Sequence, residues 1–136
     1  MIMEYLSRSI EETKEVGRQL ARSGYRVFVL EGELGAGKTS LVQGLAEELG
    51  ILNITSPTFV LMNKYQLKGN KSFCHFDFYR IENDEEAIFA KEFILDENNI
   101  ICIEWPVKEV LPKEVVSMKI EIIDEDKRKI IVDYGE

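Results

Sequence analysis

The sequence predicts an α/β domain with a mostly parallel central sheet, antiparallel additions and flanking helices. A continuous apolar run, Val27 to Leu30, leads into a glycine-rich segment and then into a helical pattern. Such a run is typical of a strand that is buried on both faces of a parallel sheet. A second run of this kind, Ile100 to Ile103, and a hairpin pattern near the end of the sequence add parallel and antiparallel strands to the same domain.

The N-terminal half alternates helix and strand. Ser9 and Glu12 fit a capping box, so we expect a helix to begin there and to end at Gly24. After the first apolar strand, leucines recur at helical spacing over residues 38–49, and Gly50 is a natural stop.

The rest of the chain contributes two strand pairs and a short helix. The expected elements are strands over Thr58–Gln66 and Ser72–Asp77 joined by a turn at Lys68–Lys71, a helix over Asp84–Phe93, the strand Ile100–Ile103, and a terminal hairpin of Met118–Ile123 and Arg128–Tyr134.

Length and composition indicate one domain over residues 1–136. At 15.7 kDa, folding would bury about two-thirds of the chain's surface, enough for one hydrophobic core. A composition of 45% hydrophobic and 31% charged residues excludes a disordered or low-complexity chain.

The charge balance bears on partners. There are 17 Lys and Arg residues against 25 Asp and Glu residues, giving a net charge of −8. Nucleic-acid binders carry a basic surface, so we expect no direct contact with RNA or DNA without help. The acidic surface is either a simple solubility feature or a surface that docks onto a basic protein.

Cysteine use and hydropathy indicate a cytoplasmic protein with no membrane contact. Cys74 and Cys102 each lie in an apolar run and are expected to be buried, reduced thiols. No stretch reaches the roughly 18 consecutive apolar residues of a membrane span. Residues 1–9 lack the basic region and apolar block of a signal peptide.

One motif carries specific chemistry. Residues 32–39 match the pattern G-x-x-x-x-G-K-[ST] of a phosphate-binding loop, or P-loop, and lie between a buried strand and a helix start. Glycines let backbone N–H groups turn toward phosphate oxygens, and the helix N-terminus adds partial positive charge. The motif therefore predicts a P-loop nucleotide-binding domain in which Lys38 reaches the β and γ phosphates and the Thr39 hydroxyl ligates Mg²⁺. The expected nucleotide-binding residues from this loop are Gly35, Ala36, Gly37, Lys38, Thr39 and Ser40.

Other residues indicate which nucleotide the loop binds and which carboxylates could serve the metal. ATP is favoured over GTP because the sequence contains no N/T-K-x-D tetrapeptide for reading guanine. A Mg²⁺-linked carboxylate is needed at the end of a neighbouring strand. Glu104 follows the second apolar run, and Asp77 is a second candidate, although both also fit solvated strand ends. Trp105 adjoins Glu104 and fits either a core position or a place beside the site.

Two further residues have open roles. His75 fits a packed or hydrogen-bonded strand residue better than a general base. Arg80 fits a structural ion pair better than an arginine finger acting on phosphate.

Together these residues resemble a known family. The P-loop, Ser56-Pro57-Thr58-Phe59, the segment from His75 to Arg80, and Glu104-Trp105-Pro106 occur in the order of the bacterial TsaE (YjeE) family, the small ATPase of tRNA threonylcarbamoyladenosine biosynthesis. The resemblance covers nearly the whole chain. The P-loop is generic, whereas the ordered set of the other three segments is specific.

The resemblance implies roles for individual residues. Lys38 and Thr39 would serve phosphate and Mg²⁺, Glu104 would be a second magnesium-linked residue, and Asp77 would be an essential acid that orders the attacking water. The implied catalytic set is Asp77, Glu104 and Lys38. Thr58 would approach the γ-phosphate, and Thr13, Trp105 and Arg128 match family positions close to the nucleotide.

The resemblance also implies partners. Such proteins act with TsaD and TsaB, and only this complex touches tRNA, at the adenosine just 3′ of the anticodon. Three function classes stay open: an ATPase subunit of this assembly, a small-molecule kinase that shares the P-loop, and a nucleotide-binding scaffold that does not hydrolyse. A kinase normally needs a lid and an acceptor pocket, and 136 residues leave little chain for either.

Overall fold

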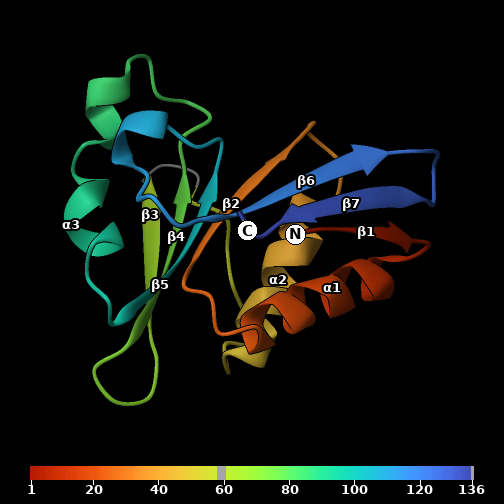
Figure 1. Ribbon diagram of the computed structural model, residues 1–136, viewed down its shortest axis with the longest axis horizontal. Coiled ribbons are helices and arrows are strands. Elements are labelled where there is room, and N and C mark those ends of the chain that lie inside the picture. Colours follow the sequence, from red (N-terminus) through yellow and green to blue (C-terminus); the bar gives the residue numbers. More distant parts are fainter. Residues whose placement is uncertain (58–60, 136) are drawn as a thin grey trace.

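A single sheet runs through the part of the chain that the computed structural model describes, residues 1–57 and 61–135. Its strand order is β1-β7-β6-β2-β5-β4-β3, with helices on both faces (Figure 1). The strands are β1 (Ile2–Ser7), β2 (Val27–Gly32), β3 (Met62–Gln66), β4 (Ser72–Asp77), β5 (Asn99–Glu104), β6 (Val116–Ile122) and β7 (Arg128–Asp133). The helices are α1 (Ile10–Arg22), α2 (Lys38–Glu48) and α3 (Ala90–Ile94), with 3₁₀ turns η1 (Asp84–Ala87) and η2 (Lys108–Val110).

The sheet has a parallel centre and antiparallel margins. β2 pairs in parallel with both β5 and β6, and β4 pairs in parallel with β5. β3 is antiparallel to β4 at one margin, and β7 and β1 are antiparallel at the other. This confirms the predicted fold class. Since parallel strands end at a common edge, the carboxyl ends of β2, β4, β5 and β6 meet on one side of the molecule.

The alternation of side chains along β2 divides the hydrophobic core between the two faces of the sheet. Phe28 and Leu30 point to the face covered by α1 and α2, where Leu41 and Leu45 of α2 pack against the sheet. Val27 lies on the opposite face, in the cluster that α3 and the 3₁₀ turns help to form. Figure 1 shows this arrangement, with α1 and α2 on one side and α3 on the other. Burial on both faces explains why β2 is a continuous apolar run.

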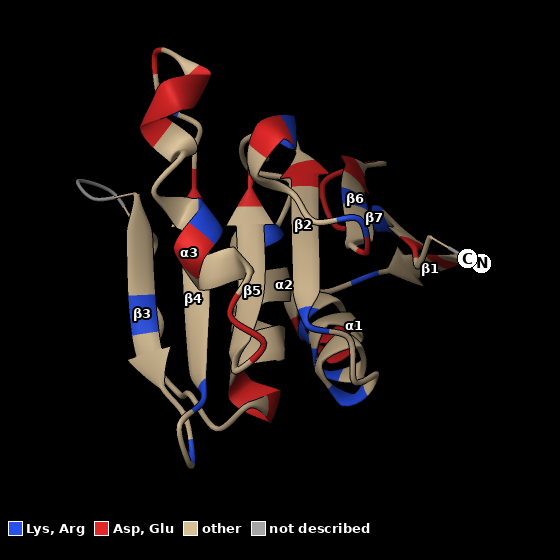
Figure 2. Ribbon diagram, turned by 60° about the vertical axis from the view of Figure 1, so that its left-hand side comes forward, with Lys and Arg blue, Asp and Glu red and all other residues tan. Residues whose placement is uncertain are grey.

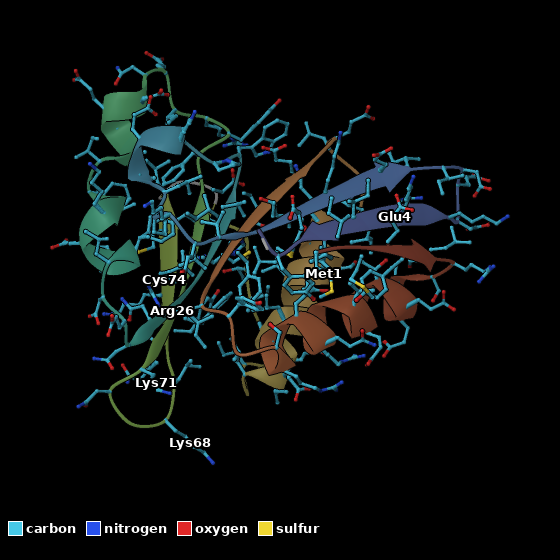
Figure 3. All side chains as sticks on the ribbon, viewed as in Figure 1. Met1, Glu4, Arg26, Lys68, Lys71 and Cys74 are labelled. Carbon is cyan, nitrogen blue, oxygen red and sulfur yellow. The ribbon has the colours of Figure 1, made fainter. Side chains whose placement is uncertain are left out.

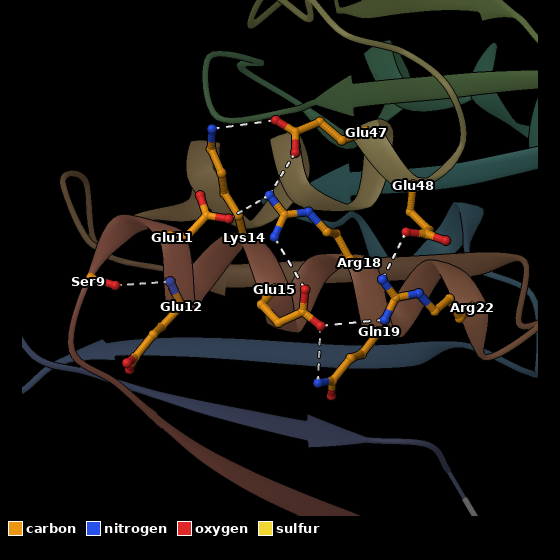
Figure 4. A network of polar contacts seen from close by, with 10 residues as sticks. All are labelled: Ser9, Glu11, Glu12, Lys14, Glu15, Arg18, Gln19, Arg22, Glu47 and Glu48. Carbon is orange, nitrogen blue, oxygen red and sulfur yellow. Dashed lines mark hydrogen bonds and ion pairs between the residues drawn. The ribbon is translucent and has the colours of Figure 1, made fainter.

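Two glycines let α1 and α2 approach closely. A methyl group at Gly44 of α2 would overlap the carbonyl oxygen of Lys14, and one at Gly17 of α1 would overlap the carbonyl oxygen of Leu41. Charged side chains close the outer side of this contact (Figure 4). Arg18 of α1 donates to Glu47 of α2 at 2.9 Å. The close contact with α1 therefore holds α2, and with it the P-loop, against the sheet.

The structure adds one strand that was not predicted, corrects one expected helix and leaves one expected strand partly outside its range. Residues 2–7 form β1, a strand that the sequence did not predict. The helix expected over Asp84–Phe93 is wrong as a single element and is instead η1 followed by α3. The Glu86 carboxylate accepts from the backbone N–H of Asn83 at 3.0 Å and fixes the first turn to the preceding loop. The strand expected over Thr58–Gln66 begins at Met62, while residues 58–60 lie outside the described part.

The remaining elements and both thiols match the predictions. Lys68 and Lys71 lie on the β3–β4 turn, at the end of the molecule away from the carboxyl ends of the parallel strands (Figure 3). Cys74 and Cys102 are free and buried, and burial raises the pKa of the Cys74 thiol to about 11. In the described residues, no helix combines the length and apolar character needed to cross a bilayer.

The glycine contact predicts a cost for Gly44→Ala. Alanine is the better helix former by about 1 kcal/mol. Its methyl group has no room beside the Lys14 backbone, so overpacking should outweigh this gain and leave a net loss of about 2 kcal/mol in the free energy of unfolding. Urea denaturation measures the change. Gln43→Ala, at the neighbouring half-buried position, is the control. A Gly44→Ala variant as stable as the natural protein would contradict the close approach.

Candidate nucleotide-binding site

Two carboxylates lie side by side at the carboxyl edge of the sheet. Asp77 ends β4 and Glu104 ends β5, and the two residues are direct partners in the parallel register. Neighbouring residues on paired strands point to the same face, here the face of α1 and α2. β2, on the other side of β5, ends at Gly32, where the P-loop begins. The sheet therefore places both predicted acids next to the phosphate-binding loop.

The P-loop has the backbone that its sequence predicts. Gly35 and Gly37 adopt φ values of +81° and +104°, a region that is unfavourable for side chains with a Cβ. α2 starts at Lys38, directly after the loop, and Gly37 caps it without a side-chain hydrogen bond. The first N–H groups of α2 are available to a ligand, and the positive end of the helix dipole points toward the loop.

Lys38 is held inside the site. Its ammonium Nζ donates to the Gly32 carbonyl oxygen at 2.6 Å and lies 4.2 Å from the centre of the Trp105 ring. The residue is only 6% exposed, and burial lowers the pKa of the ammonium, while the charges of Glu104 and Asp77 oppose the change. The cation thus already lies beside the loop, on partners that a phosphate group would replace.

Trp105 is fixed by its backbone and by Tyr79. It has a φ of +55°, which is strained for a residue with a bulky side chain. Its N–H donates to the Leu30 carbonyl oxygen at 3.3 Å, and its ring lies 4.9 Å from that of Tyr79. Strain of this kind is often found at functional sites, and here it turns the indole toward Lys38.

Glu104 is buried with a histidine partner. It is 6% exposed, and its Oε2 lies 2.6 Å from Nε2 of His75, which is 2% exposed. An ionised Glu104 requires His75 to carry its proton on Nε2, which leaves Nδ1 without a hydrogen-bond partner among the described residues. His75 is therefore the hydrogen-bonded strand residue that the sequence favoured, and the structure adds that its partner is the predicted magnesium ligand.

Asp77 is less buried and carries an electrostatic penalty. Burial raises the pKa of its carboxyl above the usual range, and the charge of Glu104 adds to the rise. The backbone N–H of Tyr79, which donates to Oδ1 at 2.9 Å, opposes it. Two acids placed this close cost stability unless a cation joins them.

Two cavities flank the P-loop and share Gly37. One, of about 360 Å³, contains the predicted catalytic set of Lys38, Asp77 and Glu104, together with Thr39 and Trp105. The other, of about 530 Å³, contains Ala36, Ser40, Thr13 and Arg128. Gly35 lines the first cavity. The structure thus gathers the predicted site residues that it describes around one loop, whereas Thr58 lies outside the described residues.

Thr13 and Arg128 support the second cavity from distant parts of the chain. The Thr13 hydroxyl is 2.7 Å from the Ser7 hydroxyl, so α1 is linked to the end of β1. Nε of Arg128 donates to the Ala36 carbonyl oxygen at 2.8 Å, which ties the P-loop to β7. Sequence spacing alone gave no sign of either contact.

The donor set suits Mg²⁺ with a nucleotide. Thr39 offers a hydroxyl, and Glu104 and Asp77 offer carboxylates, all of them oxygen ligands of the kind Mg²⁺ prefers. Mg²⁺ is commonly held by one or two protein groups with substrate phosphates and water completing its shell. In the described part of the chain, no cluster of three His, Cys, Asp or Glu residues forms an all-protein metal cage. The residues fit a metal that arrives with its nucleotide.

The His75–Glu104 contact predicts a measurable coupling. His75→Ala should cost about 3 kcal/mol because it leaves a buried carboxylate without its partner. The same change in a Glu104→Ala background should cost less, and a double-mutant cycle in urea should give a coupling of about 1–2 kcal/mol. A coupling near zero would reduce His75 to a packing residue.

The raised pKa of Asp77 predicts a pH-dependent effect of Asp77→Asn in nucleotide-free protein. Because folding raises this pKa, the ionised carboxyl disfavours the folded state at neutral pH, and the penalty disappears once acid protonates it in both states. The variant should therefore melt at a higher temperature than the natural protein at pH 7. Thermal melts should show the difference shrinking as pH falls toward 4. A difference that grows in acid would contradict the assignment.

Comparison with known proteins places this site in a family. The model of the family "Threonylcarbamoyl adenosine biosynthesis protein TsaE" matches residues 7–130. The tRNA threonylcarbamoyladenosine biosynthesis protein TsaE of Aquifex aeolicus is 34% identical over 135 residues, covering 96% of this chain and 95% of that protein. The protein of the same name from Treponema pallidum is 37% identical over 139 residues, covering 96% of this chain and 99% of that protein.

A solved structure agrees with the sequence relatives. The crystal structure of Bacillus subtilis YdiB superposes with a TM-score of 0.77 at 28% identity, and the match covers 99% of this chain and 87% of that one. The family match spans most of the chain, and the relatives align over nearly their whole length. The chain therefore belongs to the TsaE family and has its P-loop α/β fold.

Proposed function

We propose that this protein binds MgATP and hydrolyses it as a subunit of the machinery that makes threonylcarbamoyladenosine in tRNA, next to the anticodon. The observation that carries the proposal is the single cavity in which the P-loop residues Lys38 and Thr39 face Asp77 and Glu104. The relatives named above, tRNA threonylcarbamoyladenosine biosynthesis proteins, supply the biological setting.

In the proposed mechanism, the chain positions the phosphates and supplies positive charge. The N–H groups of the P-loop and of the start of α2 donate hydrogen bonds to the phosphate oxygens. Lys38 leaves the Gly32 carbonyl oxygen and binds the β and γ phosphates, where its charge opposes the charge that develops in the transition state.

The two acids divide the remaining work. Glu104, oriented by His75, and the Thr39 hydroxyl would hold Mg²⁺. When bound, the metal would supply positive charge to the phosphates. Asp77, next to Glu104 in register, accepts a hydrogen bond from the attacking water and aligns it.

Two other functions compete with this one. A small-molecule kinase would need an acceptor pocket, and the cavity of about 820 Å³ that shares Trp105 and Tyr79 with the site is the observation that keeps this alternative open. A non-hydrolysing scaffold would use the same P-loop without turnover. Phosphate transfer to an added metabolite would favour the kinase, and tight binding with no turnover in any complex would favour the scaffold.

The family resemblance supports a proposal about the partners of the protein and its place in the cell. We propose that the protein acts in the cytoplasm with TsaD and TsaB, and meets tRNA only through that complex. A net charge of −8 supports the absence of direct tRNA contact, because like charges repel the phosphate backbone.

Lys38→Ala should weaken MgATP binding by at least about a hundredfold, the loss expected when a charge-assisted phosphate contact of roughly 3 kcal/mol is removed. Calorimetric titration measures it. The fluorescence of Trp105, the only tryptophan, should change on nucleotide addition in the natural protein, because Lys38 leaves its ring. Lys68→Ala removes the same charge from the distant β3–β4 turn and should bind normally. Unchanged affinity in Lys38→Ala would refute the phosphate site.

Hydrolysis should be slow in the isolated protein and should rise when TsaD and TsaB are added, because a partner that closes the site excludes water and strengthens its electrostatics. Glu104→Ala and Asp77→Ala should lower turnover in the complex by about a hundredfold while changing ATP affinity much less. Phosphate release is the measurement, with Glu97→Ala as an exposed control. Full turnover without partners would reject partner gating in favour of a stand-alone enzyme.

A further inference from the structure

A second, larger cavity adjoins the nucleotide site. It measures about 820 Å³ and lies at the carboxyl ends of β2, β5 and β6, where it shares Trp105 and Tyr79 with the P-loop cavity. None of the roles proposed above for hydrolysis uses it as a site. Its position at the edge where the active-site strands end makes it the surface from which a bound molecule could influence the nucleotide.

The floor of this cavity is apolar. Phe78, Val107 and Ile120 line it and are buried, and Ile122 at its margin is 45% exposed. Ile122 therefore extends the apolar lining of the cavity to the protein surface.

The rim of the cavity is acidic. Glu31, Glu33, Asp84 and Glu121 line it together with a single basic residue, Lys119. Lys119 is 61% exposed and lies 4.0 Å from Glu121, so it offsets only part of this charge. Figure 2 shows acidic residues at the end of β2 and on the helical turn that precedes α3, at the same end of the molecule. We call this cavity, with its apolar floor and four acids, the acidic groove.

Charge and shape select the occupant. Nucleic acid would be repelled by the rim. A second copy of this chain would bring another net charge of −8 to the same surface. An apolar small molecule would fill the floor and leave the four carboxylates unused. A protein segment that alternates arginine or lysine with apolar residues satisfies both parts of the groove, because its cations meet the rim while its apolar side chains cover the floor.

We propose that the acidic groove docks such a basic, apolar segment of a partner protein, and that docking is coupled to nucleotide binding through Trp105. The proposal deepens the proposed function, on which it rests, by naming the surface and the chemistry of the partner contact. Trp105 lines the groove, and Lys38 lies over its ring. A guanidinium that stacks on Trp105 or Tyr79 would compete with Lys38 for the indole and favour its release toward phosphate.

The test uses the whole protein and a fluorescein-labelled peptide in which arginine alternates with leucine. Fluorescence anisotropy should show binding that weakens with added salt, and a peptide with glutamate in place of arginine should not bind. The double variant Glu31→Lys/Asp84→Lys should bind the arginine peptide at least about tenfold more weakly. The control Glu92→Lys/Glu97→Lys makes the same change in net charge at exposed positions and should differ by less than about twofold.

Several outcomes would contradict the proposal that the acidic groove is a docking site. Equal losses in both double variants would show long-range charge attraction without a site. If spermine displaced the peptide when both were present at the same concentration of positive charge, the groove would be a simple cation site. Unchanged intrinsic Trp105 fluorescence on binding of an unlabelled arginine peptide would remove the coupling. Calorimetric ATP titration of each variant checks that the P-loop is intact.

A second arm separates this proposal from the proposed function. Immobilised TsaD–TsaB complex should capture the natural protein and the control variant, and should capture the groove variant at least about tenfold more weakly. Capture of all three alike would overturn the groove as the contact and leave the partnership standing. Binding of the arginine peptide in the groove without any capture by TsaD–TsaB would reject the partnership and leave the groove standing.

Discussion

The parallel pairing of β2, β5 and β4 is the constraint on which the site depends. It brings the end of β2, where the P-loop starts, to the same edge as Asp77 and Glu104. A shift of one residue in the β4–β5 register would turn one of these carboxylates to the opposite face of the sheet. Such a slip would also exchange the side chains that these strands present to the hydrophobic clusters on the two faces, and would disrupt the packing of both. Hydrophobic burial therefore fixes the geometry of the chemistry.

The site is costly to maintain. Lys38 and Glu104 are nearly buried charges, and Asp77 has a raised pKa because burial and Glu104 oppose its ionisation. The ion pair network between α1 and α2 lies on the outside, where water screens each pair and its contribution to stability is small. The hydrophobic clusters on both faces of the sheet must offset these penalties. A nucleotide with its metal would relieve them, since it brings partners of both signs to the unsatisfied groups.

Strongly patterned segments could be predicted from the sequence, and segments defined by distant contacts could not. The P-loop, β2, β4 and β5 carry their structure in local residue patterns. β1 does not, because it is an edge strand with exposed apolar residues and pairs only with β7 at the other end of the chain. The partnership of His75 with Glu104 likewise depends on the packing of β4 beside β5, which no local pattern records. The split between η1 and α3 depends on the Glu86 carboxylate, which accepts a hydrogen bond from the backbone of Asn83 in the preceding loop.

Trp105 connects these levels of structure. Its left-handed backbone conformation costs on the order of 1–3 kcal/mol, and its hydrogen bond to Leu30 and its contact with Tyr79 hold it there. It directly follows Glu104, so a change in its backbone moves a carboxylate of the site. Its ring holds the Lys38 ammonium, so a change in its side chain moves the principal cation. A residue that touches both charges and also lines the neighbouring groove can transmit binding at one cavity to the other without any large movement of the sheet.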